Sequence, residues 1–302
     1  MTAEPWLDDL DGTVSAHVVE VDGVPMSGIV AHAADPRGVI VAVHGGATRA
    51  GYFDCPGHPA NSLLRVAQSA GYTAIALDRP GYGTSRPFAD QMDTSRRVDL
   101  AYGAVAEFTA GRSTGEGVFV WAHSAGSELA VRMAADAERG AALLGLELAG
   151  TGLEHQAVAR EILGGHERNA APAGVRKLLW EPASLYSPDV IGGAMIASRT
   201  PPFEGAELRS WARVTFPALA PAVRVPVHFT AAEFERVWRR DPEALAEITA
   251  LFSASPRVVA DEFVGGGHNL SLGHTARAYH LSVLSFIEYC VARHTHPDLP
   301  TP

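Results

Sequence analysis

Short, uninterrupted runs of apolar residues, rich in Val, Ile, Leu and Ala, recur along the chain and alternate with longer amphipathic stretches. A short run that is apolar at every position is typical of a strand buried on both faces of a parallel sheet. An earlier pair of Val-rich segments alternates more loosely and is joined by Asp22-Gly23, which predicts a hairpin. The hairpin segments are residues 14–21 and 26–33; the apolar runs are 39–43, 73–77, 118–122 and 143–148, with two more from 225 and 257.

Helical patterns fill most of the stretches between these runs. One expected helix carries Glu128 and Arg132 at (i, i+4) spacing, which predicts an ion pair on its solvent-facing side. Strands that alternate with helices predict βαβ units. The fold class is therefore α/β, with a mostly parallel central sheet flanked by helices. The expected helices are residues 61–70, 94–110, from the turn at 123–126 to about 139, 241–252 and about 275–293.

The alternating pattern stops between residues 152 and 222. This stretch contains scattered Gly and Pro and several short amphipathic pieces, with no clear strand. An insertion of this length between two strands is long enough for a helical cap. We therefore expect residues 1–151 and 223–302 to form the core and residues 152–222 to form an inserted cap, or lid.

Composition and charge narrow the class of protein. Apolar residues make up 47% of the 302-residue chain and charged residues 19%, which excludes a disordered protein. The formal net charge of −10 argues against nucleic acid as a partner, because nucleic-acid binders usually carry a basic patch. Two cysteines, Cys55 and Cys290, are too few for a disulfide framework.

Membrane and secretory segments are not expected either. The chain has no run of about 18 apolar residues, so no membrane-spanning helix is predicted. The N-terminus lacks a basic end followed by an apolar stretch, so no secretory signal is visible. We expect a soluble, cytoplasmic protein. The sequence does not indicate its oligomeric state.

Residues 122–126, Ala-His-Ser-Ala-Gly, lie between an expected buried strand and an expected helix. A serine hydroxyl is a poor nucleophile at neutral pH, so it needs a base within hydrogen-bond reach and backbone N–H donors for the oxyanion. A sharp strand-to-helix turn presents such a hydroxyl, and small neighbours are required because the turn is crowded. The pattern therefore predicts a nucleophilic Ser124.

Here the chain resembles the α/β-hydrolase superfamily, although Ala122 replaces the first glycine of the usual Gly-x-Ser-x-Gly turn. Residues 44–46, His-Gly-Gly, look like the family's oxyanion loop. Residues 78–85, Asp-Arg-Pro-Gly-Tyr-Gly-Thr-Ser, are similar to the turn after the next strand. Residues 225–227 begin the strand before the family's acid, and His268 follows the last strand, where the family keeps its base.

The resemblance implies roles for individual residues. Ser124 would be the nucleophile and His268 the general base and later the general acid. The backbone N–H of Ala125 and one from Gly45 or Gly46 would form the oxyanion hole. We expect His44 to brace the oxyanion loop and His123 to pack behind the turn, both as structural residues.

The acid that orients the base is less well specified. Alignment from residues 225–227 places Glu235 at the family's acid position, with Glu233 two residues earlier as the alternative. Glutamate is acceptable because the acid only accepts the imidazole N–H and stabilises the imidazolium. In a third hypothesis, Glu233 and Glu235 are both solvated, and Glu147 or Glu154 is the acid that orients the base.

Nothing in the sequence supports a cofactor or metal. The histidines are dispersed, with no His-x-x-x-His pair on a helix. Residues 265–267 are three consecutive glycines and predict a flexible loop; no Lys-Ser/Thr or helix follows, so they do not form a phosphate loop. Large apolar residues of the expected cap would either line an acyl pocket or pack the cap on the core: Trp180, Tyr186, Met195, Ile196, Phe203 and Trp211.

Two classes of function remain, besides a binding protein on an inactive scaffold. The first is a serine hydrolase that cleaves an ester or thioester of a hydrophobic, medium-sized substrate through an acyl-enzyme. The second is a lyase, a carbon–carbon hydrolase, or a cyclising or acyl-transfer enzyme, with His268 as base. Fold analogy alone does not choose between them.

Overall fold

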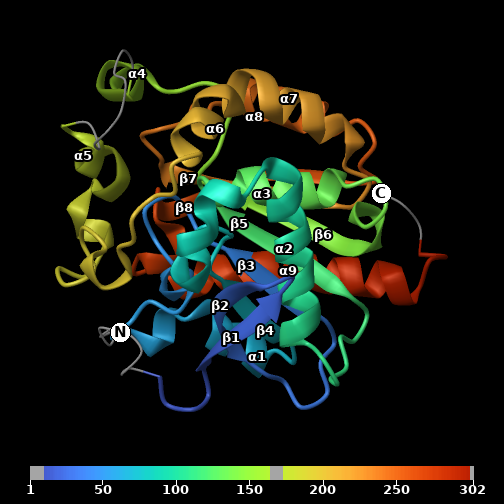
Figure 1. The fold of residues 1–302 in the computed structure, drawn as a ribbon. Coiled ribbons are helices and arrows are strands. Elements are labelled where there is room, and N and C mark those ends of the chain that lie inside the picture. Colours follow the sequence, from blue (N-terminus) through green and yellow to red (C-terminus); the bar gives the residue numbers. More distant parts are fainter. Residues whose placement is uncertain (1–9, 164–172, 300–302) are drawn as a thin grey trace.

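A single sheet forms the centre of the molecule in the computed structural model, which describes residues 10–163 and 173–299 (Figure 1). Within these residues the sheet has eight strands in the order β1-β2-β4-β3-β5-β6-β7-β8. The strands are β1 (Ser15–Val21), β2 (Val24–Ala31), β3 (Val39–Val43), β4 (Thr73–Leu77), β5 (Val118–His123), β6 (Leu143–Ala149), β7 (Val227–Phe234) and β8 (Val258–Gly267).

The predicted α/β class and the predicted strands are confirmed. Strands β1 and β2 form an antiparallel hairpin whose turn, Asp22-Gly23, has φ angles of 48° and 74°. Two consecutive residues with positive φ match the twist of a tight hairpin. β2 pairs antiparallel with β4, and every pairing from β4 to β8 is parallel.

Helices cover both faces of the sheet (Figure 1). Helices α1 (Leu63–Ser69) and α9 (Ala276–Thr295) pack on one face, and α2 (Thr94–Phe108), α3 (Gly126–Ala135) and α8 (Pro242–Leu251) pack on the other. Side-chain caps begin three of them: Ser62 accepts a hydrogen bond from the N–H of Arg65, Asp93 from Arg96 and Asp241 from Ala244.

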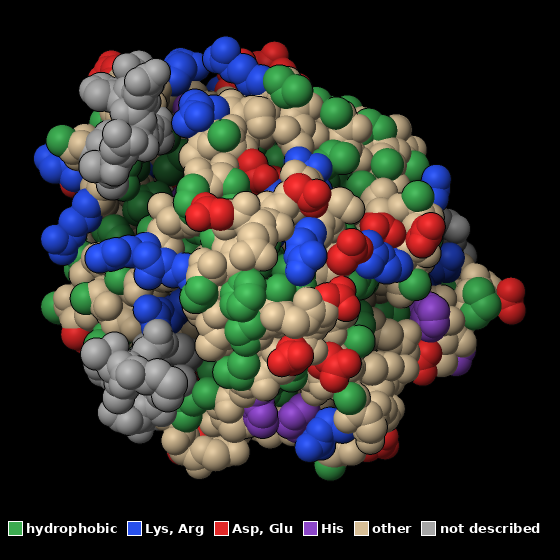
Figure 2. Space-filling model, in the orientation of Figure 1, with side chains coloured by type: hydrophobic (Ala, Val, Ile, Leu, Met, Phe, Trp, Pro, Cys, Tyr) green, Lys and Arg blue, Asp and Glu red, His purple; other side chains and the backbone are tan. Residues whose placement is uncertain are grey.

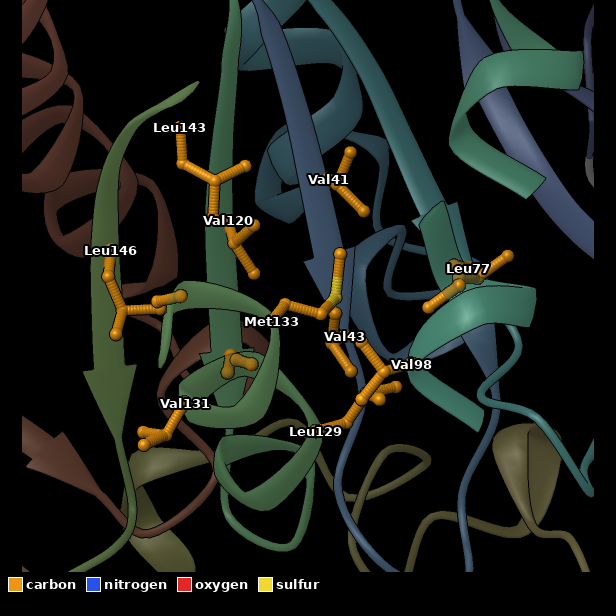
Figure 3. Packing of buried hydrophobic residues seen from close by; sticks show 14 of the residues in the cluster. Val41, Val43, Leu77, Val98, Val120, Leu129, Val131, Met133, Leu143 and Leu146 are labelled. Atoms are coloured by element: carbon orange, nitrogen blue, oxygen red, sulfur yellow. The ribbon is translucent and has the colours of Figure 1, made fainter. Parts of the chain in front are cut away.

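Alternate residues of the central strands enter two separate hydrophobic clusters. Val41 and Val43 of β3 belong to the cluster under α2 and α3, which Figure 3 shows with Leu129 and Met133 above the sheet. Ala42, between these two valines, and Ile40, just before them, belong to the cluster under α1 and α9. A strand buried on both faces needs an apolar residue at every position, which is why the central strands are recognisable in the sequence.

One predicted loop is wrong. Residues 265–267 were expected to be flexible, but β8 continues through them to Gly267. The register between β7 and β8 shifts between Ala232 and Phe234, and Gly265 adopts a φ of +78° there. The glycines thus allow an irregularity in a paired strand rather than a free loop.

Residues 152–222, the inserted segment, lie between β6 and β7. Their described parts contain helices α4 (Ala157–Leu163), α5 (Val175–Trp180), α6 (Glu204–Ser210) and α7 (Phe216–Leu219), with short turns of other helix types between them. Trp211 and Phe216 pack into the cluster of α3, whereas Trp180 and Tyr186 pack into the cluster of α9. The inserted segment is therefore attached to both sides of the sheet.

The inserted segment also changes the environment of Glu128. The sequence pattern placed this residue on a solvent-facing side of α3, but only 3% of it is exposed. Glu128 pairs with Arg132, as expected, and also with Arg97 of α2, which in turn contacts Glu207 of α6. The predicted solvent-facing position is wrong because Arg97 of α2, which Glu207 of α6 contacts from its other side, packs on this part of α3.

Charge is unevenly distributed on the face drawn in Figure 2. Lys and Arg side chains gather along the side formed by the inserted segment, whereas acidic side chains are more frequent over the remaining helices. None of the described helices is long and apolar enough to cross a membrane.

A buried polar network joins β6, β7 and α9 away from the turn at Ser124. The carboxylate of Glu147 lies 2.5 Å from His228 Nδ1 and accepts hydrogen bonds from Thr230 Oγ1 (2.7 Å) and Tyr279 Oη (2.9 Å). Burial alone would lower the pKa of His228, but the adjacent Glu147 carboxylate raises it above the ordinary value.

The raised pKa of His228 predicts a pH-dependent stability. A histidine whose pKa is higher in the folded than in the unfolded state stabilises the fold fully below its unfolded pKa, and this stabilisation is lost as pH rises through the folded value. We expect the free energy of unfolding to fall over that window, and Glu147→Gln to make the fall smaller. Part of it should remain, because Asp261 lies 3.4 Å from His228 Nε2 and also raises this pKa. Glu147→Leu should cost about 3 kcal/mol, because it removes the buried carboxylate that pairs with His228.

Denaturant unfolding measures these effects in the parent and both variants. The measurements run from a pH below the unfolded-state pKa of His228 to a pH above its folded-state pKa. If the free energy of unfolding changed with pH at the same slope in the parent and in Glu147→Gln, the pH dependence would not come from this pair.

Candidate active site

Ser124 occupies a strained turn between β5 and α3. Its φ angle is +52°, in the left-handed region that non-glycine residues rarely adopt. Its N–H donates to the carbonyl of Ala149 at the end of β6 (2.8 Å), and its carbonyl accepts from the N–H of Ser127 (2.9 Å). The side chain remains partly exposed. A hydroxyl is therefore presented at the carboxyl end of the sheet.

Gly126 is dictated by the packing of this turn. A Cβ atom at this position would lie 2.4 Å from the carbonyl oxygen of Val43 and 2.6 Å from that of His44. Both atoms belong to the backbone and have little room to move. The last glycine of the motif is thus required by sterics, whereas buried Ala122 keeps its methyl group within the core cluster.

His268 and Glu235 form a buried pair beside this turn. His268 follows β8, and its Nδ1 lies 2.8 and 3.1 Å from the two carboxylate oxygens of Glu235. Glu235 follows β7 and also accepts the N–H of Val237 (2.7 Å). Burial alone would raise the pKa of Glu235, but His268 and the backbone N–H donors lower it below its ordinary value. An ionised Glu235 holds the proton of the imidazole on Nδ1 and leaves Nε2 as the acceptor.

The other acidic candidates point elsewhere. Glu233 accepts the N–H of Gly265 (2.8 Å) and so connects β7 to the irregular part of β8. Glu147 belongs to the network with His228, and Glu154 pairs with Arg239 (3.0 Å). Among the four carboxylates considered from the sequence, Glu235 is the one that meets His268.

Gly150 lies where Ser124 and His268 approach each other. Ser124 is hydrogen-bonded to the preceding residue, Ala149, and a Cβ at Gly150 would lie 3.2 Å from His268 Cε1. The same Cβ would lie 2.9 Å from His123 Nε2. The glycine at the end of β6 thus leaves the space into which both histidines fit.

His123 has a more specific contact than the packing role expected for it. Its Nε2 lies 2.8 Å from the backbone carbonyl of His268, and its ring stacks on Tyr52 with centroids 4.4 Å apart. Burial, then the neighbouring His268, lowers its pKa well below the ordinary value. The neutral ring can donate one hydrogen bond, which it directs to the main chain of His268.

The expected oxyanion residues surround Ser124. A Cβ at Gly45 would lie 3.2 Å from Ser124 Cβ, and a Cβ at Gly46 would lie 3.5 Å from Ala125 Cβ. His44 braces this loop, as expected: Nδ1 lies 2.8 Å from the carbonyl of Gly45, and Nε2 accepts the N–H of Arg79 (3.1 Å). Gly45 therefore adjoins Ser124, and Gly46 adjoins Ala125, the residue after the serine.

Three further residues of this region were not assigned a role from the sequence. Arg79 and Tyr82 lie in the turn after β4, and both contact the loop at residues 45–47. Both also contact Glu204 of the inserted segment. The turn itself was recognisable as a motif, but Glu204 lies in a stretch that carries no motif, so no sequence signal identified it.

Large apolar residues of the inserted segment mostly pack against the core. Trp180, Tyr186, Ile196 and Trp211 are buried, whereas Met195 is 43% exposed. Tyr186 contacts the segment that carries His268: its hydroxyl accepts the N–H of Asn269, the next residue (3.3 Å).

No cluster of three or more His, Cys, Asp or Glu side chains that could hold a metal ion occurs within residues 10–163 and 173–299. Cys55 and Cys290 are buried free thiols.

A mostly parallel sheet, a serine at a strained strand-to-helix turn and a buried His–Glu pair after the last strands define a protein of the α/β-hydrolase class. The family model described as "Alpha/beta hydrolase family" matches residues 40–280. The chain belongs to this family and is an α/β-hydrolase enzyme. No match was found among curated proteins.

Solved structures share the fold at low sequence identity. An N-acyl homoserine lactonase in complex with N-hexanoyl homoserine is 14% identical (TM-score 0.66; 92% of this chain and 98% of that chain). A lipase in its open form is 16% identical (0.64; 92% and 100%). A thermostable carboxyl esterase from Bacillus coagulans is 15% identical (0.63; 92% and 99%). At these identities the likeness concerns the fold.

Glu235 and Glu233 have different contacts, and this difference can be tested directly. Glu235→Gln should slow covalent labelling of Ser124 by a fluorophosphonate by about 10³–10⁴-fold, because the imidazole loses the charge that orients it and stabilises its protonated form. Glu233→Gln is the matched control, since glutamine still offers an oxygen to the N–H of Gly265, and it should label at the parental rate. Slow labelling of Glu233→Gln with normal labelling of Glu235→Gln would show that the acid lies two residues earlier.

Proposed function

We propose that this enzyme is a serine hydrolase that cleaves an ester or thioester of a hydrophobic, medium-sized acyl substrate through an acyl-enzyme. The observation that carries the proposal is the buried Glu235–His268 pair next to the strained turn of Ser124. In this proposal Ser124 is the nucleophile, His268 the base and then the acid, and Glu235 the orienting acid. The N–H groups of Ala125 and of Gly45 or Gly46 bind the oxyanion.

The first half-reaction forms the acyl-enzyme. Nε2 of His268 accepts the Ser124 hydroxyl proton while the serine oxygen bonds to the carbonyl carbon of the substrate. Negative charge moves to the carbonyl oxygen, where backbone N–H donors stabilise it. When the intermediate collapses, the bond to the leaving alcohol or thiol breaks, and this group takes the proton from His268.

The second half-reaction releases the acyl group. His268 removes a proton from water, the resulting oxygen bonds to the acyl carbon, and the ester bond to Ser124 breaks. The proton returns to the serine oxygen, and a carboxylic acid leaves. Glu235 remains ionised throughout and stabilises the imidazolium twice in each cycle.

Contacts of the inserted segment support a substrate of limited size. The N–H of Ser198 donates to the carbonyl of Ala47 (2.9 Å), beside the expected oxyanion loop. Tyr186 packs beside His268 on the other side. We propose that the inserted segment acts as a cap over the site, with apolar side chains such as Ile196 near the acyl group.

Activity toward 4-nitrophenyl acetate, butyrate, octanoate and dodecanoate, and toward matched thioesters, tests this function. We expect the highest kcat/KM at an intermediate chain length, because a closed cap favours apolar groups until the site is filled. Ser124→Ala should lower kcat by roughly 10⁴-fold or more.

Mass spectrometry after rapid quenching should detect an acyl adduct on Ser124. Ser124→Ala that keeps substantial activity, together with a parent enzyme that forms no adduct, would overturn the acyl-enzyme. That combination would favour the lyase or carbon–carbon hydrolase reading, in which His268 acts directly on the substrate.

A further inference from the structure

Glu204 of the inserted segment is buried against the turn after β4. It is the first residue of α6, and its side chain is 4% exposed. One carboxylate oxygen accepts a hydrogen bond from Nη2 of Arg79 (2.6 Å). The hydroxyl of Tyr82 lies 2.8 and 2.9 Å from the two carboxylate oxygens. Arg79 and Tyr82 are themselves buried. A carboxylate from the inserted segment thus completes a polar cluster inside the core.

The two partners of Glu204 hold opposite ends of the expected oxyanion loop. Nη2 of Arg79 also donates to the carbonyl of Gly45 (3.0 Å), so one nitrogen divides its two hydrogens between the loop and Glu204. The hydroxyl of Tyr82 accepts the N–H of Ala47 (3.1 Å) while it donates to Glu204. Glu204 therefore fixes the direction in which each partner faces the loop.

The contact at Gly45 has a direct consequence for the next N–H group. In a trans peptide the C=O of one residue and the N–H of the following residue point in opposite directions. Arg79 holds the Gly45 carbonyl together with His44 Nδ1 (2.8 Å) and Thr48 Oγ1 (3.0 Å). With the carbonyl on this side, the N–H of Gly46 is turned to the other side of the same peptide plane. Rotation of this plane would remove that donor from its position.

Charge and space at Gly46 agree with this arrangement. A Cβ at Gly46 would lie 2.9 Å from Glu204 Oε1, so the absence of a side chain there makes room for the carboxylate. An unpaired carboxylate this close would oppose negative charge on a substrate oxygen. The guanidinium of Arg79 pairs with this carboxylate and neutralises it.

We propose that Glu204 is a positioning residue. Through Arg79 and Tyr82 it holds the Gly45–Gly46 peptide with its N–H directed toward the oxyanion, and so couples the seating of the inserted segment to the completed oxyanion hole. This inference rests on the proposed function. Glu204 does not touch the reacting atoms; it acts through two residues of the core.

The test compares three variants with a control on the same helix. Glu204→Ala should lower kcat for the best 4-nitrophenyl ester by about 10²–10³-fold, the effect of losing one oxyanion donor, with KM nearly unchanged. Glu204→Gln, which keeps an acceptor, should recover part of this loss. Tyr82→Phe should also lower kcat, as Glu204→Ala does. Glu207→Gln removes an acid of the same helix that pairs with Arg97, whereas Arg79 and Tyr82 donate to Glu204, and it should leave kcat unchanged.

A second measurement separates this role from a structural one. A trifluoromethyl ketone forms an oxyanion when Ser124 adds to it, so its inhibition constant should weaken in parallel with kcat across the variants. Circular dichroism checks the fold, and if Glu204→Ala does not fold, Glu204→Gln and Tyr82→Phe carry the test. Parental kcat and inhibition constants in both of these variants, or an effect on KM alone, would overturn the proposal.

Failure of this inference differs from failure of the proposed function. If only the inference is wrong, the parent still forms an adduct at Ser124 and Ser124→Ala is inactive, while Glu204 variants behave like Glu207→Gln. If the function is wrong, the parent forms no adduct and the ketone does not inhibit it, whatever residue stands at position 204.

Discussion

Close contact between backbones at the carboxyl end of β5 constrains the whole candidate site. The start of α3 lies so near the end of β3 that position 126 has no room for a Cβ atom. Ser124 must therefore turn sharply, with a φ of +52°, and its N–H bonds to the end of β6. The serine is fixed between the segments that follow β3 and β6, and every group that serves it has to come from the same edge of the sheet.

The Glu235–His268 pair reaches this edge because β7 and β8 are neighbours whose ends are not in simple register. In a regular parallel pair, the segments that follow β7 and β8 would lie side by side without any additional contact. Here the register shifts after Ala232, and Glu233 holds the N–H of Gly265 across the irregularity. Glu233 and Glu235 thus have different tasks: one joins the two strands, and the other faces the imidazole. Spacing of two residues along an extended chain does not separate these tasks; only the cross-strand pairing does.

Sequence patterns predicted the elements whose burial is decided locally. Residues 39–43 and 118–122 are apolar throughout because both faces of these strands are covered. The sequence also indicated Ser124, His268 and the pair of acidic candidates. It failed where a distant segment supplies the environment. Glu128 has the spacing of a surface residue, but Arg97 of α2 contacts it, and Arg97 is in turn held by Glu207 of α6, whose sequence carries no motif. Glu204 was missed for the same reason.

The acidic residues of α6 illustrate why buried charge is retained at this contact. Burial of an ion pair gives little net stability, because the loss of hydration offsets the attraction, so apolar side chains would attach the inserted segment equally well. Apolar contacts, however, tolerate sliding, whereas hydrogen bonds to Arg79 and Tyr82 accept one geometry. The two acids also differ. Burial, and next the neighbouring Glu128, raises the pKa of Glu207 to about 7 despite Arg97, so its charge near neutral pH is incomplete. Glu204 instead lies between a guanidinium and a tyrosine hydroxyl that both donate to it. Of the two, it is Glu204 whose hydrogen bonds fix the inserted segment in one position relative to the loop at residues 45–47.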